Sequence, residues 1–325
     1  MQPLNKAFEN QWYVVGLAEE IRVGKKRAVK LFGQDIVIWR HADGHLGAID
    51  ARCPHMGASL AVGRVVDDAV ECPYHGFRYD ETGRCIETPL RKADALIPRT
   101  LCNRHYAVRE KSDWVFIFWG EPSAAPDAIP FFEDVQEPLL HTWSVREWPV
   151  SFTRFIENTV DVAHLGTVHR GTLSHTIPDV VEVSVEVEGN LISMTPPSTT
   201  DLPVASRILY PNLALLHLHP KFLTVFAAVP IDEDNTRVYV RSSQAVVRWP
   251  IIGWLFSQIK HAADIAALWQ DKKALFSVRP IRIEDAKGEV LMDFEPHIVA
   301  YRKMRMRELE KFAPDVHIDN SDAAL

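Results

Sequence analysis

The sequence predicts two domains, a small all-β domain followed by a larger α+β domain, and three observations support this prediction. The chain has 325 residues, which exceeds the usual size of one domain. Its first third consists of short apolar runs separated by turn residues, as in antiparallel β structure. Its second half contains alternating strand-like segments and long helical segments that are segregated, which favours α+β over parallel α/β architecture.

The first domain is expected to span residues 1–122. Four apolar segments are predicted to be strands of this domain: residues 12–15, 29–32, 36–39 and 114–119. Asp43-Gly44 and Thr82-Gly83 are typical turn signals between such strands. A stretch rich in proline and acidic residues follows the last strand, and we expect a linker at residues 123–138.

The second domain is expected to span residues 139–325. A helical spacing of apolar residues predicts a helix at residues 152–165. Alternating segments predict strands at residues 180–187, 213–219 and 237–241. Two longer helices are predicted near the end of the chain, at about residues 252–276 and 296–312.

Composition excludes several classes of protein. Hydrophobic residues make up 47% of the chain and charged residues 24%, which is ordinary for a globular protein and unlike disordered, fibrous or polytopic membrane chains. The formal charge of −7, without blocks of Lys or Arg, argues against binding of nucleic acid or anionic membranes. Residues 1–10 lack an export signal and only four cysteines occur, so we expect a cytoplasmic protein.

Two short boxes, each with one cysteine and one histidine, are the sharpest chemical signal in the chain. They are Cys53-Pro54-His55 and Cys72-Pro73-Tyr74-His75. Two thiolates and two imidazoles can hold a tetrahedral zinc ion. They can equally hold a [2Fe–2S] cluster, with both cysteines on one iron and both histidines on the other. Zinc fingers usually pair like ligands at short separations, whereas each box here is mixed, which favours the cluster.

A carboxylate and two histidines form a second polar group within residues 157–169. Asp161 and His164 are three residues apart and share one face of the predicted helix. His164 and His169 are five apart, which separates them by about 140° on a regular helix. Joint metal binding therefore requires the helix to end or distort between them, which Gly166 permits. Two imidazoles and one carboxylate are the ligands typical of a non-haem Fe(II) site.

Both groups resemble those of the Rieske non-haem iron oxygenases, in particular the terminal oxygenase (alpha) subunits of the aromatic-ring-hydroxylating dioxygenase and demethylase family. The resemblance covers about residues 10–312, and neither box carries the further cysteine found in respiratory Rieske proteins. It implies an all-β Rieske [2Fe–2S] domain followed by an α+β helix-grip (Bet v1/START-like) catalytic domain with mononuclear iron. It also implies the four ligands of the cluster: Cys53, His55, Cys72 and His75.

The second group matches the mononuclear-iron motif of this family. The spacing is Asn158-x-x-Asp161-x-x-His164-x-x-x-x-His169. The resemblance implies that His164 and His169 bind the iron and that Asn158 and Asp161 belong to the catalytic machinery. In the family the aspartate is not a ligand. It hydrogen-bonds the first histidine and links it to a Rieske histidine, here His75, of a neighbouring subunit.

The third iron ligand is expected to be a later carboxylate, and spacing alone leaves four candidates: Asp264, Asp271, Glu284 and Asp285. In the family this ligand lies in a late helix, before an apolar-rich turn that ends near a proline. Residues 269–276, followed by Arg279-Pro280, fit this description best, so we choose Asp271. The alternative is that Asp271 is a solvated partner of the lysines that follow it.

The resemblance implies that the chain is the terminal component of an oxygenase system. The Rieske cluster would deliver electrons to the mononuclear Fe(II), which activates O₂ for monooxygenation, O- or N-demethylation, or cis-dihydroxylation of a small aromatic or cyclic substrate. No Gly-x-Gly occurs, so a dinucleotide fingerprint is missing. We therefore expect a separate NAD(P)H-dependent reductase, with or without a ferredoxin. The compact catalytic domain resembles that of the homotrimeric members.

Two other functions are compatible with part of these patterns. A Rieske-type electron carrier fused to a ligand-binding domain would explain the two boxes but not the second group. Iron content separates these functions, because the oxygenase needs about three irons per chain and the carrier about two. A structural zinc module would be colourless rather than red-brown.

Overall fold

The computed structural model of this chain describes residues 3–89, 92, 95–135, 139–170, 172, 183–195, 205–219 and 221–312. The chain forms two compact units that divide between residues 129 and 130, within the predicted linker. Residues 3–8, which the sequence analysis assigns to the first domain, pack in the second unit. Parts of the predicted linker, of the strand at 180–187 and of the C-terminal tail lie outside the described residues.

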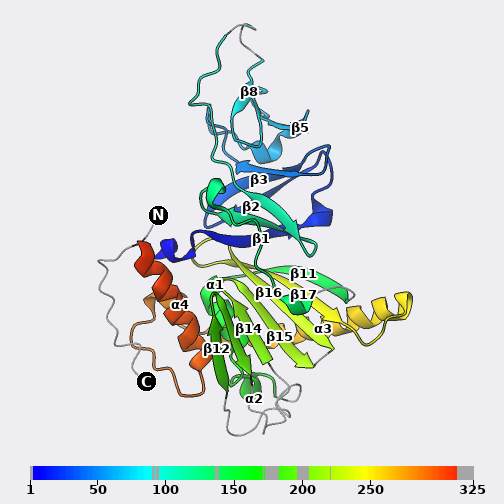
Figure 1. The fold of residues 1–325 in the computed structure, drawn as a ribbon, viewed down its shortest axis with the longest axis vertical. Coiled ribbons are helices and arrows are strands. Elements are labelled where there is room, and N and C mark those ends of the chain that lie inside the picture. Colours follow the sequence, from blue (N-terminus) through cyan, green and yellow to red (C-terminus); the bar gives the residue numbers. More distant parts are fainter. Residues whose placement is uncertain are drawn as a thin grey trace. The chain divides into compact units, whose positions relative to one another are not determined.

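The first unit is built from short antiparallel strands (Figure 1). In chain order they are β1 Gln11–Leu17, β2 Lys26–Leu31, β3 Gln34–Arg40, β4 Leu46–Asp50, β5 Arg64–Val66, β6 Ala69–Glu71, β7 Arg78–Tyr79, β8 Cys85–Glu87, β9 Val108–Lys111 and β10 Trp114–Trp119. They form three small sheets with the orders β1-β10-β9, β2-β3-β4 and β5-β6-β7-β8. The predicted all-β architecture of this part of the chain is confirmed.

The apolar segment at residues 114–119 is β10, the central strand of its sheet. All six of its side chains are buried, as a continuous apolar run requires, because neither face then meets water. A neighbouring core around Trp39 and Tyr79 includes three cysteines, Cys53, Cys72 and Cys85. The same core that stabilises the small sheets therefore also positions the cysteines of the two boxes.

The second unit contains one antiparallel sheet of seven strands (Figure 1). They are β11 Leu140–Trp148, β12 Ser184–Glu188, β13 Leu191–Thr195, β14 Ala205–Leu209, β15 Leu213–His219, β16 Phe222–Pro230 and β17 Thr236–Gln244. The order is β11-β17-β16-β15-β14-β13-β12. Consecutive strands from β12 to β17 are thus neighbours, and β11 is added at the β17 edge.

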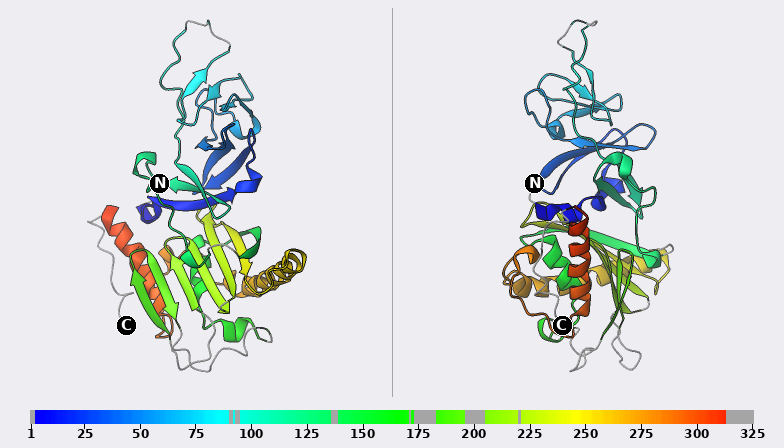
Figure 2. Two further views of the ribbon diagram at one scale, coloured as in Figure 1. Left: turned by 45° about the vertical axis from the view of Figure 1, so that its right-hand side comes forward. Right: turned by 60° about the vertical axis from the view of Figure 1, so that its left-hand side comes forward.

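Helices pack against this sheet (Figures 1 and 2). In the described part of the chain the α-helices are α1 Phe152–Val160, α2 Leu165–Val168, α3 Pro250–Leu275 and α4 Pro296–Phe312. α1 contacts β15 and β16, α3 contacts β11 and β17, and α4 contacts β12 and β13. The two predicted late helices match α3 and α4 to within two residues, and the α+β prediction for this part is confirmed.

The predicted helix at 152–165 is interrupted earlier than expected. α1 ends at Val160, and Asp161 adopts an extended conformation with ψ 118°. The Asp161 carboxylate accepts the backbone N–H of Ala163 at 2.9 Å, a local hydrogen bond that competes with continuation of a helix. The predicted break at Gly166 is therefore wrong, because this glycine lies inside the short helix α2.

Candidate metal centres and the adjoining pocket

Two loops of the first unit carry the mixed boxes and share one backbone conformation. The N–H of Gly57 donates to the carbonyl of Cys53 at 2.8 Å, and the N–H of Gly76 donates to the carbonyl of Cys72 at 3.0 Å. These glycines have φ values of +74° and +72°, a conformation that glycine adopts without steric cost. A glycine four residues after each cysteine thus closes the turn that presents each box.

The cysteines of the boxes are buried, whereas the histidines are accessible. Cys53 and Cys72 are 3% and 2% exposed, while His55 is exposed and His75 is half-buried. The two imidazole rings lie edge to face, with 4.7 Å between their centroids. This arrangement fits a [2Fe–2S] cluster whose cysteine-bound iron lies inside the unit and whose histidine-bound iron lies nearer the surface.

Hydrogen-bond donors surround the two sulfur atoms. Burial raises the pKa of Cys72, but the backbone N–H groups of Tyr74 and His75 bond its sulfur and oppose that shift. The hydroxyl of Tyr79 lies 3.2 Å from Sγ of Cys53. Such donors stabilise thiolates and tune iron–sulfur clusters. Among the described residues, the four box side chains do not gather within 4.8 Å as ligands of one tetrahedral ion would, which disfavours zinc.

A second group of candidate ligands, His164, His169 and Asp271, lies in the second unit. Their ligand atoms lie within 4.8 Å of one another. Nε2 of His164 is 3.2 Å, and Nε2 of His169 is 3.1 Å, from the same Oδ1 of Asp271. This oxygen is buried without a normal hydrogen bond. The histidines flank α2 and the aspartate lies on α3, so side chains from two distant parts of the sequence face one point, as a facial triad requires.

The ring nitrogens that point away from this group lie near oxygen atoms of other side chains. Nδ1 of His169 lies 2.7 Å from Oε1 of Gln270, and Nδ1 of His164 lies 3.4 Å from Oδ2 of Asp161. The acceptor Gln270 favours the proton of His169 on Nδ1 and leaves its Nε2 free to bind a metal, and the nearby carboxylate of Asp161 favours the same tautomer of His164. The sequence analysis missed Gln270, because its only signal is its position next to Asp271.

The electrostatics of the group favour a positive charge. Burial alone would lower the pKa of His164, but the carboxylates of Asp161 and Asp271 raise it to about 9. Burial would likewise raise the pKa of Asp271, yet the contacts with the imidazoles of His164 and His169 lower it. A buried site that stabilises both a carboxylate and a cation beside it is suited to a metal ion.

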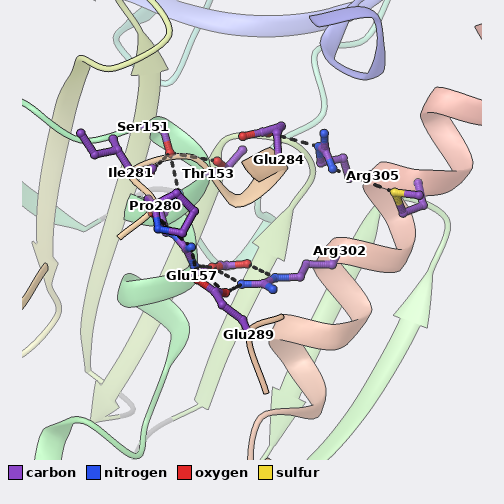
Figure 3. A network of polar contacts seen from close by, with 11 residues as sticks. Ser151, Thr153, Glu157, Pro280, Ile281, Glu284, Glu289, Arg302 and Arg305 are labelled. Atoms are coloured by element: carbon purple, nitrogen blue, oxygen red, sulfur yellow. Dashed lines mark hydrogen bonds and ion pairs between the residues drawn. The ribbon is translucent and has the colours of Figure 1, made fainter. Parts of the chain in front are cut away.

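The other carboxylates considered as the third ligand have basic partners instead: Asp264 lies 2.6 Å from Lys260, Glu284 lies 3.2 Å from Arg305 (Figure 3), and Asp285 lies 3.1 Å from Arg282. None of them belongs to the group around His164 and His169. The geometry therefore favours Asp271, and its carboxylate is buried rather than solvated.

A pocket opens beside the three candidate ligands, which form part of its wall. Asn158, Thr159 and Asp161 contribute polar groups from α1 and the residue after it. Much of the remaining wall is apolar and consists of Val162, Leu165, Leu216, Phe226, Ala267 and Leu268. A pocket with an apolar body and a few polar groups suits a small organic molecule.

A buried ion network holds α1 in place on the side of α4 (Figure 3). Glu157 accepts hydrogen bonds from Arg302 at 2.6 and 3.0 Å and from Arg154 at 3.0 Å. Glu289 bonds the same two arginines, at 2.8 Å to Arg302 and 3.2 Å to Arg154. Because Asn158 follows directly in α1, this network also fixes one wall of the pocket.

Comparison with known proteins identifies the first unit. A family model described as the Rieske [2Fe-2S] domain matches residues 11–104. Residues 11–104 form a Rieske domain. This match includes both mixed boxes. The [2Fe–2S] cluster in the description of the family is also the cluster that the buried cysteines and accessible histidines fit.

Several curated relatives of the chain are oxygenase components. The oxygenase component of 3-ketosteroid-9-alpha-monooxygenase from Rhodococcus rhodochrous is 32% identical over 168 residues, which is 50% of this chain and 44% of that protein. The oxygenase component of chloroacetanilide N-alkylformylase from Rhizorhabdus wittichii is 29% identical over 172 residues, 51% of this chain and 48% of that protein. The chain thus matches less than half the length of these relatives.

Solved structures share the fold over nearly the whole chain, beyond the Rieske domain. Dicamba monooxygenase bound to dicamba matches with a TM-score of 0.77 and 20% identity, over 94% of this chain and 98% of that one. NdmA from Pseudomonas putida CBB5 matches with a TM-score of 0.80 and 20% identity, over 96% and 94%. The fold predicted from the sequence, an all-β unit followed by an α+β unit, is therefore confirmed. Among the described helices, none has the length and apolar character needed to cross a bilayer.

Proposed function

We propose that this chain is the terminal component of a Rieske non-haem iron oxygenase. The observation that carries the proposal is the convergence of His164, His169 and Asp271 on one wall of a largely apolar pocket, in a chain that also contains a Rieske domain. A simple electron carrier has no use for a second, separate group of metal ligands beside a pocket. The names of the relatives, several of them oxygenase components, favour the same function.

The chain offers binding sites for two metal cofactors, which together would carry out the oxidation. The cluster, held by Cys53, His55, Cys72 and His75, would supply single electrons, and iron held by the second group would supply O₂ activation. The apolar wall would orient the substrate and limit water beside the reacting carbon. Asn158 lines the same pocket, where its amide offers both a donor and an acceptor.

The substrate is proposed to be a small organic molecule, aromatic or cyclic, and the reaction monooxygenation, O- or N-demethylation, or cis-dihydroxylation. Relatives named as a monooxygenase and an N-alkylformylase favour the first two outcomes. The same names describe components of larger systems, which supports a separate NAD(P)H-dependent reductase, with or without a ferredoxin. A cytoplasmic location stays a prediction from composition.

Electron transfer is proposed to occur between subunits of a homotrimer, as the family resemblance implies. Asp161 lies beside Nδ1 of His164 and would also accept a hydrogen bond from His75 of a neighbouring subunit. One carboxylate would then connect the two metal centres. We expect a trimer in size-exclusion chromatography with light scattering. In Asp161→Asn we expect both metals to remain, while the reduced Rieske absorbance persists after O₂ and substrate are added.

Rapid reoxidation coupled to product formation in Asp161→Asn would contradict that role, as would full activity of a monomer.

Iron counting on purified protein tests the oxygenase proposal directly. We expect about three irons per chain in the native protein and about two in His169→Ala and Asp271→Ala, with the Rieske EPR signal unchanged. Asp285→Ala is the matched control, because this carboxylate pairs with Arg282 outside the pocket. Two irons in the native protein would support the electron carrier instead. Three irons in Asp271→Ala would assign the third ligand to another carboxylate.

A further inference from the structure

α3 presents one continuous face to the pocket. Asp264, Ala267, Leu268 and Asp271 all line it, and their spacing of three, four and seven residues places them on one side of a helix. Seven residues correspond to about 10 Å along a helix axis. The carboxylate of Asp264 therefore lies about two turns from the candidate metal ligand Asp271, with a small apolar surface between them.

Asp264 is held by a compact set of donors. Its Oδ2 accepts the hydroxyl proton of Thr224 at 2.9 Å, the ammonium of Lys260 at 2.6 Å and the hydroxyl proton of Ser242. Lys260 also donates to Oγ1 of Thr224 at 2.9 Å. Nδ1 of His261 lies 2.8 Å from Oγ of Ser242. The cluster fixes the position of the carboxylate, because Thr224, Ser242 and Lys260 all donate to it.

The number of protons in this cluster determines which hydrogen bonds it can still form with a ligand. A hydroxyl has one proton, and the protons of Thr224 and Ser242 are both directed to Asp264. Ser242 must then accept from His261. Oδ1 of Asp264 takes part in none of these hydrogen bonds. Of the cluster, Asp264 and Thr224 line the pocket, and both have only acceptor capacity left.

We propose that Asp264 determines substrate specificity by accepting a hydrogen bond from a hydroxyl or N–H group of the substrate. The pocket would then favour molecules that carry such a donor at the end remote from the oxidised carbon. It would reject the corresponding ethers, which offer no proton, and carboxylates, whose oxygens would face other acceptors. This inference rests on the proposed function only in treating the pocket as the substrate site.

Binding of matched probes to the iron-loaded full chain tests the inference without turnover. The probes are 4-ethylphenol, 4-ethylanisole and 4-ethylbenzoate, which share one ring and differ in the polar group. Isothermal titration without reductant should show the phenol binding at least about tenfold more tightly than the ether or the acid. Asp264→Asn, which replaces an acceptor by a group that can also donate, should reduce this preference to less than about threefold.

Two further variants make the result specific to the pocket. Ala267→Leu fills the surface between Asp264 and Asp271 and should weaken binding of all three probes. Asp285→Asn makes the same chemical change outside the pocket and should keep the native preference. The inference is overturned if the phenol does not bind better than its ether to the native protein, or if Asp264→Asn retains the full preference.

The outcome is independent of the oxygenase test. A phenol preference that depends on Asp264 in a protein with only two irons per chain would uphold this inference and refute the oxygenase. Three irons per chain and oxygenation without the phenol preference would support the oxygenase proposal and refute this inference.

Discussion

Replacing Glu157 by alanine should strongly destabilise the second unit. Glu157 is 6% exposed and accepts three hydrogen bonds from the guanidinium groups of Arg154 and Arg302. Without it, the buried Arg154 and the partly buried Arg302 would have only Glu289 as an acidic partner in this network. Removing one partner of a buried ion pair costs about 3–5 kcal/mol, because the remaining charge is desolvated without compensation. For a unit of this size that corresponds to a decrease in Tm of about 6–20 °C.

Differential scanning calorimetry, with circular dichroism to assign the transition, measures this effect. Glu147→Ala is the matched control, because Glu147 pairs with Arg237 at 2.7 Å with its side chain 61% exposed. Such a surface pair contributes about 0–1 kcal/mol, so its loss should change Tm little. Glu157→Gln should lie between the two, since it retains an acceptor. A decrease for Glu157→Ala no larger than that for Glu147→Ala would refute the reasoning.

Three further predictions concern the metal centres and pH. Gln270→Leu should weaken iron binding about 10–100-fold in a competition with a chelator, because it removes the acceptor of His169; Gln258→Leu on the same helix should not. Cys72→Ser should abolish the Rieske absorption and EPR signal and lower the stability of the first unit; unchanged spectra would exclude Cys72 as a ligand. Burial lowers the pKa of His297 to about 4, although Asp161 opposes this shift. Since the unfolded chain then binds a proton that the native state refuses, stability should fall by up to about 3 kcal/mol as pH decreases from 6.5 to 4. Urea titrations should show this loss reduced in His297→Phe.

The sequence predicts elements well where the signal is local and repeated. α3 and α4 follow from long periodic segments, and β10 from an apolar run that is stable only inside a sheet. The end of α1 was misplaced because it depends on a single side-chain hydrogen bond from Ala163 to Asp161, which helical spacing of apolar residues does not reveal. Gln270 was missed because its contact with His169 joins residues 101 positions apart.

The candidate iron site depends on α3 more than on the histidine motif that reveals it. The histidines flank a short helix of four residues, which has too few internal hydrogen bonds to fix ring orientations by itself. α3 supplies the partner that both rings share, Asp271, and the acceptor that orients one of them, Gln270. Two turns before Asp271, the same helix supplies Asp264 to the wall of the pocket. Since one rigid helix carries both side chains, helix geometry fixes the distance between the candidate metal ligand Asp271 and the proposed acceptor Asp264. If the proposed function holds, a change in substrate preference therefore requires substitutions along α3 or on the facing wall rather than movement of the ligands.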